Sequence, residues 1–224
     1  MHGMYLDAYV PLIVLCTFIG GAAQAYINKT YKKWSYVPAE PATSGQAAAE
    51  GMLREAGATL VGIKSVGGTL SDYYDPRDNC LHLSSESRSG SSVASVAVAC
   101  HEAGHAIQAA DSYVPYRIRS GMAPVVSFSS QFWFVLFIMG VLVNVSGLVT
   151  LGIALFGFTV IFSLATLPVE INASRRAVEY LGSHMDERSG EGARQVLFAA
   201  ALTYVAAALI SVLQFVQLLN RSRN

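Results

Sequence analysis

Residues 125–167 read VVSFSSQFWFVLFIMGVLVNVSGLVTLGIALFGFTVIFSLATL and include no charged side chain. A bilayer core about 30 Å thick needs about 20 apolar helical residues to cross it. The stretch is long enough for two crossings, and a short polar break between Asn144 and Gly147 interrupts it. We therefore predict a transmembrane hairpin with spans from Val125 to Val145 and from Leu148 to Leu167.

Two more uncharged runs of this length lie on either side of the hairpin. The first extends from Ala8 to Ile27 and the last from Val196 to Leu219. Since lipid offers the backbone no hydrogen-bond partner, helices are expected for runs this apolar. The motif Ala23-Gln24-Ala25 in the first run resembles a signal-peptidase site, but no Lys or Arg precedes it, so we expect a retained anchor.

The composition agrees with a membrane protein. Hydrophobic residues make up 53% of the 224 residues and charged residues only 13%, and the mean hydropathy is +0.41. The formal net charge of zero gives no indication of a nucleic-acid partner. Cys16, Cys80 and Cys100 form no CxxC pair, so we expect free, buried thiols in a reducing compartment.

The basic residues indicate how the chain is oriented. Nine Lys and Arg lie between the first and second predicted spans, and four lie between the third and fourth. The positive-inside rule then places both segments in the cytoplasm and the N-terminus outside. Arg221 and Arg223, after the last span, count against this orientation. We expect a multi-pass protein of the cell membrane with a cytoplasmic active site.

The spans divide the chain into five predicted parts. These are an N-terminal transmembrane helix (1–27), a cytoplasmic α/β segment (28–124), the transmembrane hairpin (125–168), a helix and loop that follow it (169–195), and a C-terminal transmembrane helix with its tail (196–224). The fold class is therefore a mainly α membrane protein with about four transmembrane helices and a small α/β segment.

The cytoplasmic segment has secondary-structure signals of its own. Ser44 can cap a short helix that ends at Gly57. A longer helix should begin in the serine-rich stretch 84–92 and continue to about Ala110, because apolar residues recur there at helical spacing. Between the two helices, short strands are predicted at Leu60–Val66, Thr69–Tyr74 and Cys80–Leu83.

The longer helix carries His101-Glu102-Ala103-Gly104-His105, an HExxH pattern. Residues four apart share one helical face, so both imidazoles can reach the same tetrahedral metal ion. Glu102 is rotated by about 100° from His101 and can act on water without ligating the metal. Chance is the alternative reading, and the helical context argues against it. We predict one zinc ion on His101 and His105, with Glu102 as the catalytic base.

Such a site needs a third protein ligand. The downstream candidates are Glu170, Glu179, His184, Asp186, Glu187 and Glu191. Glu170 follows Pro168 at the predicted end of the third span, where a carboxylate is costly unless it is paired or bound to a metal. The alternative for Glu170 is an ion pair with Arg175 or Arg176. Glu179 belongs to another helical face, and His184 is expected in a loop.

Four motifs resemble a known family in the order in which they occur. They are LSDYYDP (Leu70–Pro76), HEAGHAIQ (His101–Gln108), LPVEINASRRA (Leu167–Ala177) and AAALTYVAAA (Ala199–Ala208). They are similar to motifs of the YugP-type membrane zinc metallopeptidases, over a range from about Val61 to Leu218. The resemblance implies a neutral zinc metallopeptidase, with a zincin-like α/β segment and a gluzincin-like ligand set.

The pattern around Glu170 is also similar to that of the HtpX-type membrane proteases, in which this Glu is the third zinc ligand. Carried over, Glu170 takes that role. The YugP-type family commonly has His at the position of Tyr73, and HtpX-type enzymes have Asp at the position of Ser174. Hydrogen bonds from Ser174 or Asn172 could replace that acidic partner.

Two further elements have open alternatives. Tyr204, in the fourth span, could donate to a developing oxyanion or could pack at the membrane interface. The strand at Thr69–Tyr74 could hold an extended substrate or could be an ordinary edge strand.

The expected function is a zinc metalloendopeptidase that cuts polypeptides, including membrane proteins. A catalytically silent membrane scaffold or adaptor that keeps the zinc site is the alternative from another class, and the intact Glu102 argues against it. Hydrolysis of some other amide is a third reading. The sequence contains no signal for a particular oligomeric state.

Overall fold

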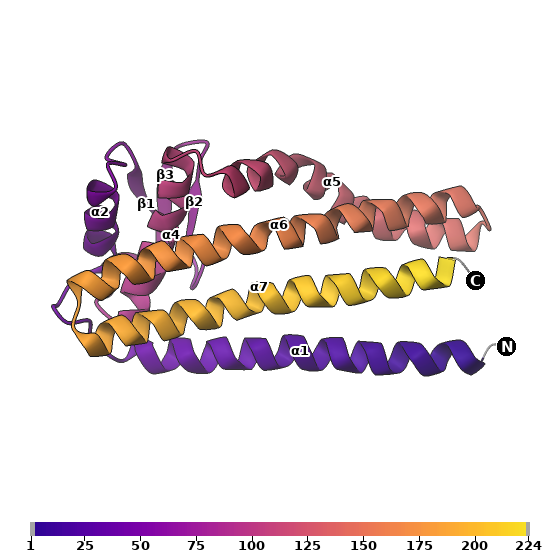
Figure 1. Ribbon diagram of the computed structural model, residues 1–224, viewed down its shortest axis with the longest axis horizontal. Coiled ribbons are helices and arrows are strands. Elements are labelled where there is room, and N and C mark those ends of the chain that lie inside the picture. Colours follow the sequence, from indigo (N-terminus) through magenta and orange to yellow (C-terminus); the bar gives the residue numbers. More distant parts are fainter. Residues whose placement is uncertain (1–2, 223–224) are drawn as a thin grey trace. The chain divides into compact units, whose positions relative to one another are not determined.

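The computed structural model describes residues 3–222, with side chains from residue 10 to residue 220. Most of the described residues are helical, and the three strands of a small sheet follow the second helix in the sequence (Figure 1). The elements are α1 (Gly3–Ser35), α2 (Gly45–Glu55), β1 (Gly62–Val66), β2 (Tyr73–Asp75), β3 (Cys80–Ser84), α3 (Ser85–Ser89), α4 (Val93–Ala110), α5 (Val114–Leu142), α6 (Ser146–His184) and α7 (Glu187–Ser222).

Four of these helices are long and apolar enough to cross a membrane, which confirms the predicted number and order of spans. They cover Val10–Ser35, Val114–Leu142, Ser146–His184 and Glu187–Asn220. Three of the helices extend beyond the predicted apolar run at both ends, whereas α5 begins earlier than its predicted span and ends at Leu142, before the predicted end at Val145. The side chains of Arg221 and Arg223, on which the objection to the predicted orientation rests, lie outside the described residues.

Helix α6 continues past the predicted end of the third span at Leu167. Although Pro168 lies inside it, the helix runs on to His184. The continuation has an apolar stripe at intervals of four residues, Val169, Ala173, Ala177 and Leu181, and all four are buried. Burial of this stripe offsets the hydrogen bond that proline removes. His184 is therefore the last residue of a helix and not a loop residue as predicted.

The chain forms two compact units. The helical unit comprises Met1–Gln24, Ile118–Leu167 and Thr203–Asn224, and the site unit comprises Ala25–Arg117 and Pro168–Leu202. We use these two names below. In the helical unit, Gly152 lets α5 and α6 approach closely, since a Cβ there would lie 2.8 Å from the Trp133 carbonyl oxygen.

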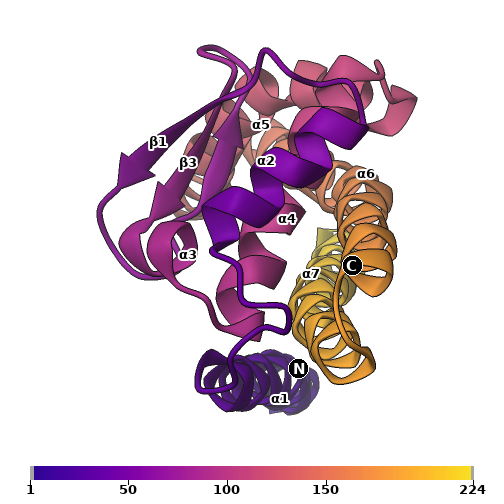
Figure 2. The same cartoon turned by 90° about the vertical axis from the view of Figure 1, so that its left-hand side faces the viewer.

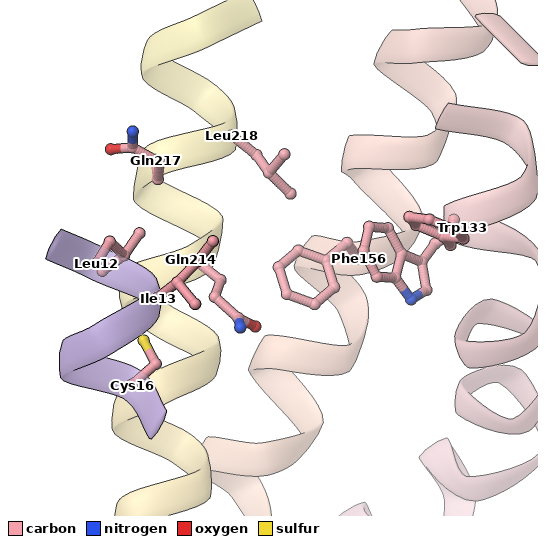
Figure 3. Close-up of a pocket in the computed structure, with 9 residues that line it drawn as sticks. Leu12, Ile13, Cys16, Trp133, Phe156, Gln214, Gln217 and Leu218 are labelled. Atoms are coloured by element: carbon pink, nitrogen blue, oxygen red, sulfur yellow. The ribbon is translucent and has the colours of Figure 1, made fainter. Parts of the chain in front are cut away.

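The helical unit also has an apolar cavity of about 340 Å³ (Figure 3). Residues of α1, α5, α6 and α7 line it, and the amide of Gln214 on α7 is directed towards Phe156 of α6. None of the residues with candidate chemistry borders this cavity among those described. Cys16, which does border it, is a free buried thiol, and so are Cys80 and Cys100, as predicted.

The sheet of the site unit has the strand order β1-β3-β2. β1 pairs in parallel with β3, and β2 pairs antiparallel with β3, so that Tyr73 lies opposite His82 and Asp75 opposite Cys80. The predicted strand at Thr69–Tyr74 is shifted towards the C-terminus. Gly68 and Leu70 adopt positive φ, at 102° and 53°, and this geometry belongs to a turn and not to a strand.

Helix α4 lies at the centre of the site unit, and both α2 and the sheet pack against it (Figure 2). Its N-cap is Ser92, whose hydroxyl accepts a hydrogen bond from the Ser95 amide, and it ends at Ala110, as predicted. Helix α2 has the predicted cap at Ser44. The apolar residues of α4 are almost fully buried, so this helix is held rigidly.

Candidate metal centre

Helix α4 directs His101 and His105 to one place because the two residues are four apart. Their rings meet edge to face, with centroids 4.8 Å apart. Helix α6 brings the carboxylate of Glu170 to the same place, and only 2% of Glu170 is exposed. Glu170 Oε2 lies 3.3 Å from His101 Nε2 and 3.5 Å from His105 Nε2.

The arginines that could have paired with Glu170 have other partners. Arg175 Nε lies 3.8 Å from Glu179 on the exposed side of α6. Arg176 Nη1 lies 2.7 Å from Asp111 Oδ2. The structure therefore brings together the three side chains that the sequence selected as ligands, and it places Arg175 and Arg176 beside the other carboxylates Glu179 and Asp111.

The donor set fits a zinc ion in chemistry and in size. Zinc prefers four tetrahedral ligands at about 2.0–2.1 Å from histidine nitrogen and carboxylate oxygen. Neighbouring ligand atoms of such a tetrahedron are about 3.3 Å apart. The two contacts of Glu170, at 3.3 and 3.5 Å, agree with that spacing. The ligand atoms of all three residues lie within 4.8 Å of one another.

The Nδ1 atoms of both histidines have partners on the side away from Glu170. His101 Nδ1 lies 3.1 Å from Ser174 Oγ, and His105 Nδ1 lies 3.0 Å from Gln108 Oε1. Of the two residues proposed from the sequence as partners of the site, Ser174 contacts His101. Asn172 contacts Gln108 and Arg176. Sequence reasoning missed Gln108, for which the only signal was its position three residues after His105.

Glu102 lies beside these residues, with 9% of its surface exposed. Its Oε2 accepts a hydrogen bond of 3.1 Å from the backbone N–H of Tyr74 on β2. Burial raises the pKa of Glu102, whereas the neighbouring His101 and His105 lower it. Because β2 pairs with β3 on its other side, this N–H lies on the edge of β2 that pairs with no other strand among the described residues.

Two other residues singled out in the sequence lie elsewhere. The ring of Tyr73 stacks on His82, with centroids 4.6 Å apart, so it has a packing role within the sheet. Tyr204 belongs to the helical unit, where 40% of it is exposed on α7. Its role as an oxyanion donor stays a prediction.

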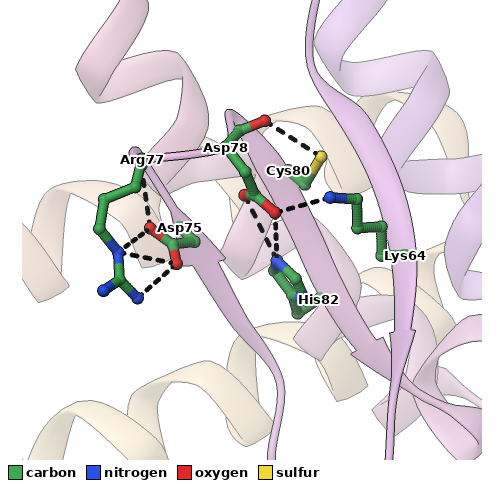
Figure 4. A network of polar contacts seen from close by, with 6 residues as sticks. All are labelled: Lys64, Asp75, Arg77, Asp78, Cys80 and His82. Atoms are coloured by element: carbon green, nitrogen blue, oxygen red, sulfur yellow. Dashed lines mark hydrogen bonds and ion pairs between the residues drawn. The ribbon is translucent and has the colours of Figure 1, made fainter.

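A second group of possible ligands, Asp75, Asp78 and His82, lies on the sheet (Figure 4). Here protein cations already occupy the carboxylates. Asp75 pairs with Arg77 at 2.7 Å, and Asp78 pairs with Lys64 at 2.8 Å. Arg77 holds the pKa of Asp75 down, at about 2. We interpret this group as a solvated ion-pair network that joins the strands.

Comparison with known proteins shows which family the sequence resembles. A sequence model of the family described as "Putative neutral zinc metallopeptidase" matches residues 9–223. The chain is 41% identical over 197 residues to "Putative membrane protease YugP" of Bacillus subtilis (strain 168), and the alignment covers 87% of this chain and 88% of that relative. No solved structure gives a significant match.

Proposed function

This chain belongs to the neutral zinc metallopeptidase family, and from this premise we propose that it is a zinc-dependent endopeptidase of the cell membrane. One observation carries the proposal. Glu102, a buried carboxylate, lies next to the cluster of His101, His105 and Glu170 and is hydrogen-bonded to the free edge of a strand. The four candidate spans support a multi-pass membrane location.

In this proposal His101 Nε2, His105 Nε2 and Glu170 Oε2 hold one zinc ion, a gluzincin-like ligand set. When bound, zinc polarises the scissile carbonyl and lowers the pKa of water to about 7. The two histidines act as ligands and not as proton carriers, because their Nδ1 atoms are engaged by Ser174 and Gln108.

Glu102 is proposed as the general base. It takes a proton from the attacking water and later delivers it to the leaving amine. The Tyr74 N–H donates to Oε2 and thereby orients the carboxylate and favours its anionic form. The second oxygen, Oε1, would receive the proton.

The edge of β2 is the proposed place for the substrate, in a zincin-like arrangement. An extended peptide can add to an exposed strand edge through main-chain hydrogen bonds. At Tyr74 that edge faces Glu102, so an added peptide would pass beside the base. Polypeptides, including membrane proteins, are the proposed substrates. The cytoplasmic orientation of the site is proposed from the basic residues between the spans.

The test compares wild type with Glu102→Gln in detergent, on a panel of membrane proteins and on small non-peptide amides, with zinc quantified in both proteins. We expect equal zinc content and a loss of peptide hydrolysis of about 10²- to 10⁴-fold. If Glu102→Gln keeps a rate within a few-fold of wild type, another group is the base. Zinc in both proteins with hydrolysis in neither would favour the scaffold or adaptor.

A further inference from the structure

The side chain of Gln108 is fully buried between α4 and α6. Its Nε2 donates to the Val169 carbonyl oxygen at 2.7 Å and to Asn172 Oδ1 at 3.0 Å. A primary amide has two N–H donors and one accepting oxygen. Both donors are used on α6, so the oxygen Oε1 is the atom left to face His105 Nδ1, at 3.0 Å.

The orientation of this amide is fixed by its surroundings. A flipped Gln108 would place its oxygen against the Val169 carbonyl oxygen, and two acceptors would then face each other in the interior. Such a contact loses a hydrogen bond and leaves buried polar atoms unsatisfied, at a cost of about 1–3 kcal/mol.

Arg176 fixes the orientation of Asn172 in turn. A guanidinium group has donors only, and Arg176 Nε lies 3.0 Å from Asn172 Oδ1. That atom must therefore be the oxygen. Arg176 is itself held by Asp111, at 2.7 Å. The direction of hydrogen bonding is thus determined from Arg176 through Asn172 to Gln108.

The consequence falls on His105. Because Gln108 Oε1 can only accept, its hydrogen bond favours a hydrogen on His105 Nδ1, and Nε2 of the neutral ring then carries the lone pair. This lone pair faces Glu170 Oε2, 3.5 Å away, and a cation between the two acceptors relieves their repulsion. A histidine ligand needs this tautomer to bind a metal through Nε2.

We propose that Gln108, Asn172 and Arg176 form a positioning chain that fixes His105 in the Nδ1–H tautomer before any metal binds. The proposal rests on the proposed function only in naming zinc as the ion that uses the lone pair. His101 differs, because the Ser174 hydroxyl that faces its Nδ1 can donate as well as accept. Of the two histidine ligands, His105 therefore has a fixed tautomer, and His101 can adopt either tautomer.

The positioning chain of Gln108, Asn172 and Arg176 also connects α4 and α6, the two helices that carry the proposed ligands. Val169 and Asn172, the acceptors of Gln108, lie on either side of Glu170 on α6. Gln108 itself lies one turn beyond His105 on α4. A single side chain thus sets both the tautomer of one ligand and the distance to another.

The test uses the full-length protein in detergent with ¹⁵N-labelled histidine. NMR spectra of the imidazole nitrogens report the tautomer of His105 in the metal-free protein at mildly alkaline pH, and chelator competition reports zinc affinity. Gln108→Met has nearly the same length and no hydrogen-bonding amide. Gln108→Glu keeps an acceptor for His105 Nδ1–H, and its carboxyl group, when protonated, can still donate to the Val169 carbonyl oxygen.

We expect wild type and Gln108→Glu to show the Nδ1–H form, and Gln108→Met to show a mixture of tautomers. Zinc affinity should fall about 10- to 100-fold in Gln108→Met, as for loss of an outer partner of a ligand, and by only a few-fold in Gln108→Glu. Ser174→Ala is the matched control, since it removes the partner of His101 and should leave the His105 signal unchanged.

An Nε2–H tautomer of His105 in the metal-free wild type would overturn the proposal. So would a Gln108→Met protein with wild-type tautomer and zinc affinity. These outcomes are distinct from failure of the proposed function, because the tautomer is read without metal and without substrate. A protein that shows the expected tautomer but binds no zinc would overturn the metal assignment alone.

Discussion

Replacing Gly104 by alanine tests whether the contact between α4 and α6 sets the geometry of the candidate metal centre. Gly104 lies next to His105, and a Cβ atom added to it would lie 2.7 Å from the Ala173 carbonyl oxygen and 3.0 Å from Ala173 Cα. These are backbone atoms within a helix, so they cannot rotate away. Gly104→Ala must therefore push the two helices apart.

The size of that movement follows from the contact distance. Non-bonded heavy atoms are at their optimum from about 3.5 Å, so relief of the 2.7 Å contact needs a separation of several tenths of an ångström. Metal sites tolerate about 0.2 Å in ligand distances. Glu170 lies one turn from Ala173 and moves with it, whereas His101 and His105 stay with α4. We expect zinc affinity to fall about 10- to 100-fold and the metal-free protein to lose about 1–3 kcal/mol of stability.

Chelator competition and thermal unfolding of purified protein measure both effects. Gly182→Ala is the matched control, because it makes the same change on α6 at a position where an added Cβ would meet no atom within 4 Å. This control should bind zinc as wild type does and gain up to about 1 kcal/mol from helix propensity. Wild-type zinc affinity in Gly104→Ala would refute the reasoning, and an equal loss in Gly182→Ala would show that the contact is not its cause.

Three further outcomes are expected. Glu170→Ala should retain zinc poorly, so stoichiometric, chelator-resistant zinc in that variant would remove Glu170 from the ligand set. Zinc should raise the melting temperature of wild type much more than that of Glu170→Ala. It should also protect both Pro168–Ala177 and His101–Gln108 from hydrogen exchange. Protection of His101–Gln108 alone would place the metal on α4 only. Cysteines introduced at the exposed positions Ser89 and Ser183 should resist an impermeant thiol reagent in intact cells, and labelling of both would reverse the proposed orientation.

Strong local signals made much of the fold predictable. The four apolar runs predicted the long helices because hydropathy over about 20 residues does not depend on the rest of the chain. The cap at Ser44 predicted the start of α2 for the same reason, since the N-cap hydrogen bond is local. The serine-rich stretch 84–92 left the start of α4 open, because several serines could act as its cap and a separate short helix, α3, occupies part of the stretch. His101 and His105 meet because helical spacing alone requires it.

Features that depend on distant partners were not predictable. The position of β2 is set by pairing with β3. Because Gly68 and Leu70 form a turn, the strand covers Tyr73–Asp75 and not the predicted range Thr69–Tyr74. The continuation of α6 beyond Pro168 depends on a buried stripe that only the packed site unit reveals. The position of Gln108 three residues after His105 is a local signal, but its contacts with α6 have none, because those partners are 61 and 64 residues away.

The two buried carboxylates of the site illustrate how different surroundings assign different chemistry to the same group. Glu170 Oε2 faces the Nε2 atoms of both histidines, so three atoms with lone pairs lie close together. A cation between them stabilises this arrangement, and Glu170 then has no role in proton transfer. Glu102 instead faces one backbone N–H from the sheet edge, which orients one oxygen and leaves the other to accept a proton. If the two roles were exchanged, the base would be held by the metal and the ligand by the strand along which the substrate is proposed to lie. These different surroundings support the proposed assignment of Glu170 to the metal and of Glu102 to proton transfer.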